Sequence, residues 1–116
     1  MDAKLSHALA HSRVKKPFGI KLASRNTKNR GFKVVIENAG KTVVATKNNG
    51  GAWNVLEVFP GADVPGYIAA VAGVLAEQHI GVEAWTTFGK DYFVVKAADG
   101  GKAFKILREY FGRGLE

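Results

Sequence analysis

The side chains that could do chemistry in this sequence are mainly basic, and they are concentrated in the first half of the chain. Residues 1–50 hold 11 Lys and Arg against two acidic residues, a net charge of +9, whereas residues 51–116 hold 6 against 8, a net charge of −2. Clustered cations attract phosphate groups and acidic surfaces. We therefore expect the first half to engage nucleic acid or an acidic nucleoprotein surface. The residues expected to make this contact are Arg13, Lys15, Lys16, Lys21, Arg25, Lys28, Arg30 and Lys33.

Catalytic and metal-binding groups are sparse. The chain has no Cys, which excludes a thiolate nucleophile, a disulfide and a Cys-based zinc site. Ser6, Ser12 and Ser24 fall in segments expected to be flexible, and the acidic residues are scattered singly, so no nucleophile–base or carboxylate pair can be named. His7 and His11 would share one helix face, but with no third ligand nearby we expect a solvent-facing pair. We expect a protein that is not an enzyme and uses no metal and no cofactor.

The basic residues are positioned by a first half with the pattern of β-strands. Residues 3–12 contain helix formers and predict a short, fraying helix that ends before Pro17. Beyond it, apolar residues alternate with polar ones, and β-branched residues are frequent. Strands are predicted at 18–22, 32–37, 41–46 and 53–59. We expect a β-meander whose outward positions are largely basic, with Trp53, Trp85 and Tyr92 either in the core or available for stacking.

In the second half of the chain, the spacing of apolar residues changes from the two-residue period of a strand to the period of a helix. Apolar residues recur at helical spacing after Pro65, and Asp63 is expected to cap the N-terminus of this helix. Strands are predicted near 80–85 and 92–96, followed by a final amphipathic helix over about 100–111. Strands followed by a βαββα unit favour an α+β fold, an antiparallel sheet with two helices on one face. With 116 residues, the chain is expected to form a single domain over 1–116.

The C-terminal half resembles an ACT domain. The motif Asp63-Val64-Pro65-Gly66, the helix end Val74-Leu75-Ala76-Glu77 and the strand start at 80–84 carry this resemblance, which extends over residues 53–111. It implies a ferredoxin-like βαββαβ fold and a small regulatory module whose ligand lies at the loop containing Asp63, Pro65 and Gly66. The sequence departs from the family at His79, where the family has Gly, so we expect a left-handed backbone there. The family's last strand has no counterpart after the final helix, so residues 18–23 or 31–38 are expected to take its place in the sheet.

Three functions are compatible with these observations. The first is a non-enzymatic protein that binds nucleic acid or an acidic partner through its basic half. The second is an ACT-type sensor of an amino acid or small metabolite. The third is a small viral or mobile-element inhibitor that binds a host protein machine.

The sequence also predicts the location of the protein in the cell and its oligomeric state. No secretory signal and no apolar run of about 18 residues is visible, so a cytoplasmic protein is expected. A homodimer is expected through the predicted strand 53–59 and the following helix, whose Tyr67, Ala70 and Val74 would form a second apolar face.

Overall fold

The strands of both halves of the chain join one antiparallel β-sheet. The computed structural model describes residues 2–24, 33–38, 41–47, 50–87 and 89–113. Its elements are α1 (Ala3–Ala10), β1 (Arg13–Val14), β2 (Phe18–Ser24), β3 (Lys33–Asn38), β4 (Lys41–Lys47), β5 (Trp53–Phe59), α2 (Tyr67–Glu77), β6 (Glu83–Thr87), β7 (Lys90–Lys96), a 3₁₀ turn (Ala97–Asp99) and α3 (Gly100–Arg113). The strand order is β3-β4-β2-β5-β7-β6, and β1 also pairs with β5. The predicted α+β class is confirmed.

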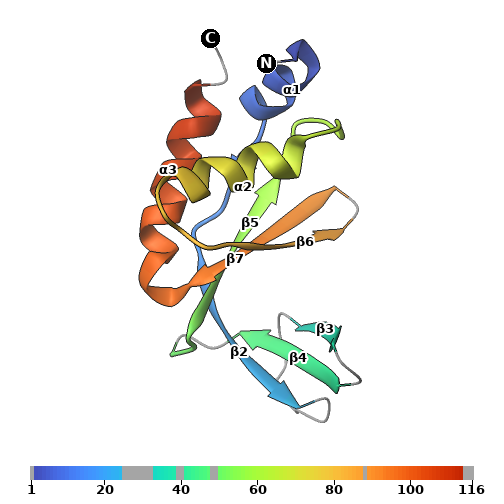
Figure 1. Cartoon of the computed structure of the whole chain (residues 1–116), viewed down its shortest axis with the longest axis vertical. Helices are drawn as coiled ribbons and strands as arrows, with labels where there is room; N and C mark the ends of the chain where they lie inside the picture. The colour runs from blue at the N-terminus through green and yellow to red at the C-terminus, as the bar shows by residue number, and fades with distance from the viewer. Residues whose placement is uncertain (1, 25–32, 39–40, 48–49, 88, 114–116) are drawn as a thin grey trace.

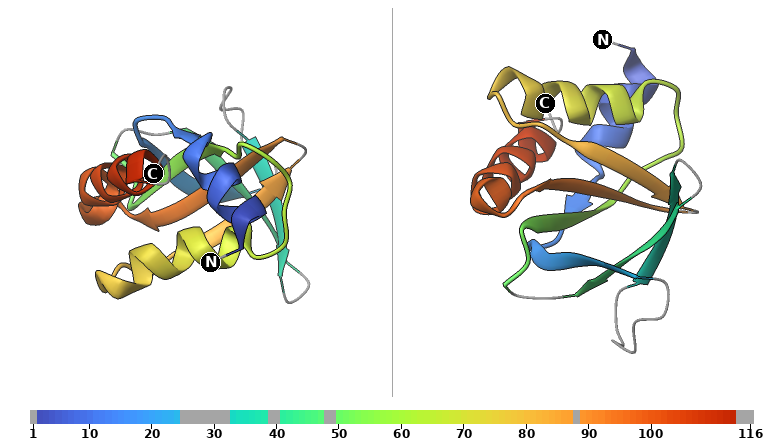
Figure 2. Two further views of the ribbon diagram at one scale, coloured as in Figure 1. Left: turned by 90° about the horizontal axis from the view of Figure 1, so that it is seen from above. Right: turned by 60° about the horizontal axis from the view of Figure 1, so that its bottom comes forward.

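The three α-helices pack on one face of β5, β7 and β6, while β3 and β4 lie at the far end of the molecule (Figures 1 and 2). Because side chains alternate across a strand, Leu56 and Phe93 point to the helices and join Leu75 of α2 and Leu107 of α3 in the main core. The opposite face carries a smaller cluster around Val55. We call this second surface the helix-free face.

A tight motif ends α2 at the position where the sequence departs from the family. His79 has φ +60° and is the one non-Gly residue with positive φ in the described part of the chain. Its N–H donates to the carbonyl of Ala76 at 2.9 Å, and the N–H of Ile80 donates to the carbonyl of Leu75 at 3.1 Å. Ile80 and Leu75 are both buried in the core. This is a Schellman motif with its hydrophobic contact, and it confirms the left-handed backbone predicted for His79.

The first half of the chain covers the outer edge of β5. Phe18 and Ile20 of β2 pair with Val55 and Trp53, and β1 pairs with the end of β5, where Arg13 is opposite Phe59. β2 thus takes the sheet position that the family fills with its last strand, as predicted for one of two segments. A meander would pair each strand with the next, but here β2 lies between β4 and β5. The alternation that identifies a strand carries no information about its partner, so the strand order could not be predicted from it.

Helix α1 is held more firmly than the sequence predicts. Asp2 caps it, with its carboxylate accepting from the N–H of Lys4 at 2.7 Å, and Ala8 and Leu9 are buried in the main core. The C-terminal end of the helix rests on the β5–α2 loop, where the N–H of Gly61 donates to the carbonyl of Ala8 at 3.2 Å. The predicted fraying helix is therefore an integral part of the core.

Several local predictions need correction. The helix expected from Pro65 begins at Tyr67, its N-cap is Gly66, and no side chain caps it, so the capping role predicted for Asp63 is wrong. The strand near 80–85 begins at Glu83, because the Schellman motif takes up the preceding residues. Tyr67 is 5% exposed and belongs to the main core, so it cannot contribute to the predicted dimer surface. No helix within the described residues is both long and apolar enough to cross a membrane.

Candidate functional site

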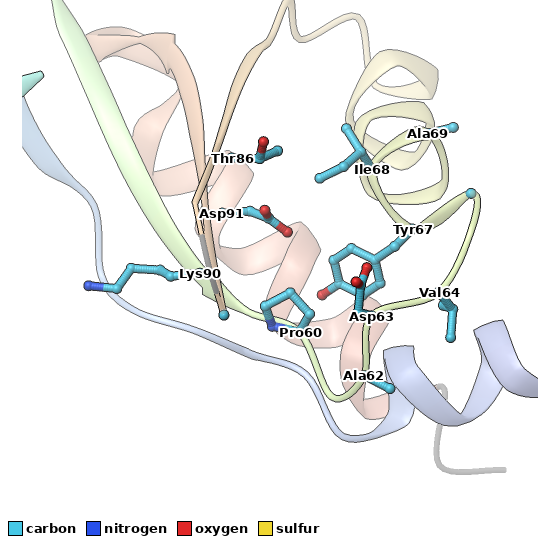
Figure 3. A pocket seen from close by; sticks show the side chains of 12 residues that line it. Pro60, Ala62, Asp63, Val64, Tyr67, Ile68, Ala69, Thr86, Lys90 and Asp91 are labelled. Carbon is cyan, nitrogen blue, oxygen red and sulfur yellow. The ribbon is translucent and has the colours of Figure 1, made fainter. Parts of the chain in front are cut away.

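A cavity of about 730 Å³ opens between the β5–α2 loop and the β6–β7 hairpin (Figure 3). One wall is formed by the loop and the first turn of α2, and the other is formed by the end of β6 and the start of β7. The lining residues are Pro60, Ala62, Asp63, Val64, Gly66, Tyr67, Ile68, Ala69, Thr86, Gly89, Lys90 and Asp91. The loop predicted to bind a ligand therefore borders a real cavity. Of its three predicted residues, Asp63 and Gly66 line the wall, whereas Pro65 does not.

Two carboxylates face this cavity from opposite walls. Asp91 of β7 is only 7% exposed, and Figure 3 shows its carboxylate turned toward Tyr67 and Asp63. Burial is the main cause that raises the pKa of the Asp91 carboxyl above its ordinary value, and the negative charge of Asp63 raises it further. Within the described residues, no Lys or Arg forms an ion pair with Asp91. The two walls therefore carry negative charge that no cation among the described residues balances by an ion pair at Asp91.

Lys90 does not supply that cation. Its ammonium group points away from the cavity in Figure 3 and lies 3.3 Å from the carboxylate of Glu57 on the helix-free face. The hydrogen bond to Glu57 raises the pKa of Lys90. Lys90 is therefore charged at neutral pH, and its charge is directed to the other side of the sheet.

The first turn of α2 offers the opposite polarity. The N–H groups at the start of a helix have no intrahelical acceptor and attract anions. Gly66, the N-cap, has φ +83° and no side chain to accept from them. Ile68 and Ala69, whose N–H groups belong to this turn, line the cavity. A donor-rich helix end and an acidic wall thus border the same space.

A buried hydroxyl network fixes the shape of this site. The hydroxyl groups of Ser12 and Tyr67 lie 2.6 Å apart, and Ser12 donates to the carbonyl of Ala8 at 2.7 Å. Since a serine hydroxyl has one proton to donate, Ser12 accepts from Tyr67 and also from the N–H of Gly61 at 3.3 Å. Desolvation raises the pKa of Tyr67 to about 12, so its phenol stays protonated at neutral pH. The network joins α1, the β5–α2 loop and the first residue of α2.

Sequence reasoning missed Ser12 and Asp91 for different reasons. Ser12 was expected in a flexible segment, yet it is 8% exposed, and its partner Tyr67 is 55 residues away in the chain. The sequence predicts Asp91 as the last residue of a turn over 88–91, where an acidic residue is ordinary, whereas the structure places it in β7. In the structure Asp91 shares the core side of β7 with Phe93 and Val95, but the apolar run Tyr92–Val95 has no alternation that would reveal this side from the sequence.

The predicted basic residues do not form one cluster. Arg13 and Lys15 lie on the helix-free face near Phe59, whereas strand alternation directs the exposed Lys21 to the other face of β2 from Ile20. Lys16 is exposed in the connection between β1 and β2. Lys33 is the first residue of β3, opposite Thr46 of β4. Arg25, Lys28 and Arg30 lie outside the described residues.

Two exposed histidines stand close together on α1. The ring centroids of His7 and His11 are 4.1 Å apart, and Nδ1 of His11 lies 2.9 Å from the carbonyl of His7. Within the described part of the chain, no group of three or more potential metal ligands is present. The pair is a solvent-facing feature of the helix.

The succession β5-α2-β6-β7-α3, with a cavity at the β5–α2 loop, defines a ferredoxin-like module. Residues 54–109 match the family model of the ACT domain, and this segment of the chain is an ACT domain. The resemblance seen in the sequence is thereby confirmed.

Two solved structures are similar over most of the chain. VC0802 from Vibrio cholerae, a protein of unknown function described as a possible transport protein, is 12% identical with a TM-score of 0.72, and the match covers 94% of this chain and 96% of that protein. Atu0741 from Agobacterium tumefaciens is 18% identical with a TM-score of 0.58, covering 83% of each chain. At these identities the likeness shows the fold alone. No curated protein matches the sequence.

Proposed function

We propose that this protein is a regulatory, ligand-sensing protein that binds a free amino acid, or a small metabolite with adjacent ammonium and carboxylate groups, in the cavity between the β5–α2 loop and the β6–β7 hairpin. One observation carries the proposal. Asp91 is a buried carboxylate on the cavity wall, beside Asp63, and no cation of the described chain pairs with it. A buried, unbalanced acid costs stability, so its presence favours a role in binding a positive group.

The two ends of an amino acid fit the two polarities of the cavity. Its ammonium group would be held by Asp91 and Asp63, and its carboxylate would accept from the N–H groups of Ile68 and Ala69 at the start of α2. The ACT domain supports the same proposal, because modules of this family are often amino-acid sensors. The volume of about 730 Å³ leaves room for a side chain as well.

A thermal-shift screen of the 20 amino acids and of amine-bearing metabolites tests the proposal, followed by calorimetric titration of any hit. A ligand at about 100 times its dissociation constant adds about 2.7 kcal/mol to the free energy of unfolding. Asp91→Asn keeps the shape of the side chain and removes its charge. We expect it to weaken binding about 10- to 150-fold, the loss of a charged hydrogen bond worth about 1.5–3 kcal/mol.

Glu109→Gln is the matched control. It removes a carboxylate from an exposed position on α3, away from the cavity, and should leave the affinity unchanged. The proposal fails if no compound of the panel stabilises the protein, or if Asp91→Asn binds the ligand as tightly as the unmodified chain does.

A further inference from the structure

The helix-free face carries a group of aromatic residues that lie outside the ACT cavity: Phe18, Trp53, Trp85 and Tyr92. On β5, β6 and β7, strand alternation and the pairing of Trp85 with Tyr92 bring these two side chains side by side. Trp53 and Val55 follow on β5, and Phe18 of β2 is opposite Val55. Trp53 is 38% exposed, the one large hydrophobic side chain within the described residues with so much open surface. Both tryptophans of the chain lie on this face.

The face is hollowed between its two tryptophans. A cavity of about 350 Å³ is lined mainly by apolar residues, among them Trp53 and Trp85, and also by Glu83 and Lys96. Lys96 is the cross-strand partner of Trp53. A cavity of this size and composition suits one planar ring, which the indoles would contact and Lys96 would flank with positive charge.

Cations gather at the other end of the same face, around Phe59. The guanidinium of Arg13 lies 5.6 Å from the centre of the Phe59 ring, and the ammonium groups of Lys15 and Lys90 each lie 5.5 Å from it. Lys90 also lies 5.6 Å from the ring of Tyr92. Glu57 neutralises part of the charge of Lys90, but Arg13 and Lys15 are exposed and come from the strongly basic first half of the chain.

We propose that the helix-free face binds single-stranded nucleic acid, with phosphates held by Arg13, Lys15 and Lys90 and with bases stacked on Tyr92 and in the cavity between Trp53 and Trp85. Aromatic rings and cations along one face are the combination that tracks a nucleic-acid backbone while stacking its bases. The two ends of the face, Phe59 and Trp53, are six residues apart on β5, about 20 Å, a length that several nucleotides of an extended strand can cover.

A single strand fits these features better than a duplex or an acidic protein. Bases in a duplex are already stacked on each other and cannot enter a cavity between two indoles. An acidic peptide would contact Arg13 and Lys15 but would fill the cavity only with an aromatic side chain at the right distance, whereas every nucleotide carries a planar base. This proposal concerns the face opposite the ACT cavity and does not depend on whether an amino acid binds there.

Quenching of intrinsic tryptophan fluorescence is the direct test, because both tryptophans are on the proposed face. The full chain is titrated with an oligothymidylate of about 12 nucleotides, a length near the usual site size, at several salt concentrations. We expect quenching, tighter binding of the single strand than of a matched duplex, and a linear fall of log K with log salt.

Three variants locate the contact. Arg13→Gln combined with Lys15→Gln should reduce the slope of log K against log salt by about 1.4, since each phosphate contact to a single strand contributes about 0.7. Trp53→Ala should weaken binding about tenfold to hundredfold, the loss of one stacked base. Lys102→Gln combined with Lys105→Gln is the matched control, because it removes two exposed charges from α3 on the helix side.

Each alternative outcome overturns the proposal. The absence of quenching at low salt would exclude the face as a nucleic-acid site. Equal weakening by the control pair would show diffuse charge attraction, and tighter binding of the duplex would exclude stacking. Equal quenching by polyglutamate would identify an acidic protein partner instead.

Discussion

Gly61 is the position where one added methyl group tests how the N-terminal helix is held. A Cβ at Gly61 would lie 2.5 Å from the carbonyl oxygen of Ala8 and 2.6 Å from Cβ of His11. Both are closer than real Cβ contacts, and neither atom is the free end of a flexible side chain. We therefore expect Gly61→Ala to push the end of α1 away from the β5–α2 loop.

The size of the effect follows from the contacts that this shift breaks. Overpacking costs about 1–3 kcal/mol. The N–H of Gly61 also loses its bonds to Ala8 and Ser12, at about 0.5–1.5 kcal/mol for a hydrogen bond. We expect the free energy of unfolding to fall by about 2–4 kcal/mol. At about 4 °C per kcal/mol, Tm should fall by about 8–16 °C.

Urea denaturation measures this change, and Gly73→Ala is the matched control. Gly73 lies within α2, and a Cβ there would meet nothing within 4 Å, so the same substitution should stabilise the protein by about 0.5–1 kcal/mol through helix propensity. The reasoning is refuted if Gly61→Ala changes stability by less than about 0.5 kcal/mol, which is typical of an unconstrained surface position.

Three further substitutions have defined outcomes. Ser12→Ala removes the acceptor of the buried Tyr67 hydroxyl and of the partly buried Gly61 N–H, and should cost about 1–3 kcal/mol. In a double-mutant cycle measured in urea, Tyr67→Phe should cost less in the Ser12→Ala background than alone, and additive costs would mean that the two hydroxyls are not coupled. His79→Gly should raise the free energy of unfolding by about 0.5–1 kcal/mol, because the relief of strain at the positive φ exceeds the added entropy of the unfolded chain. Urea denaturation measures this change, and a loss of stability would show that the His79 imidazole contributes to the fold. The raised pKa of Asp91 favours its neutral form in the folded state, so the free energy of unfolding falls as pH rises through that pKa. Asp91→Asn should therefore be more stable than the unmodified chain at pH 7, and this advantage should vanish below the ordinary carboxyl pKa of 3.8. Urea midpoints without this pH dependence would contradict the assignment.

The sequence predicts the parts of this structure that depend on neighbouring residues. The end of α2 is such a case, since helical periodicity up to Leu75 and the family position of His79 predict a left-handed turn that the structure confirms. The Asp63-Val64-Pro65-Gly66 motif likewise identifies the loop that borders the cavity. In both cases the information lies within a few residues of the feature.

The parts that could not be predicted depend on contacts between distant segments. Asp63 has the residue type of a helix cap, but the helix begins at Tyr67, which is buried in the core and hydrogen-bonded to Ser12, a residue 55 positions away in the chain. Asp91 and Asp63 become a pair only when the hairpin folds against the loop. The aromatic face arises in the same way, from the register of β5, β7 and β6.

The position of β2 has a consequence for the order in which the protein can fold during synthesis. In a βαββαβ module, the strand beside the first one comes last in the chain, so this edge stays open until synthesis is complete. Here the neighbours on that side, β1 and β2, leave the ribosome before β5 does. The edge of β5 can be paired as soon as it emerges, which shortens the time in which its backbone groups could associate with another nascent chain.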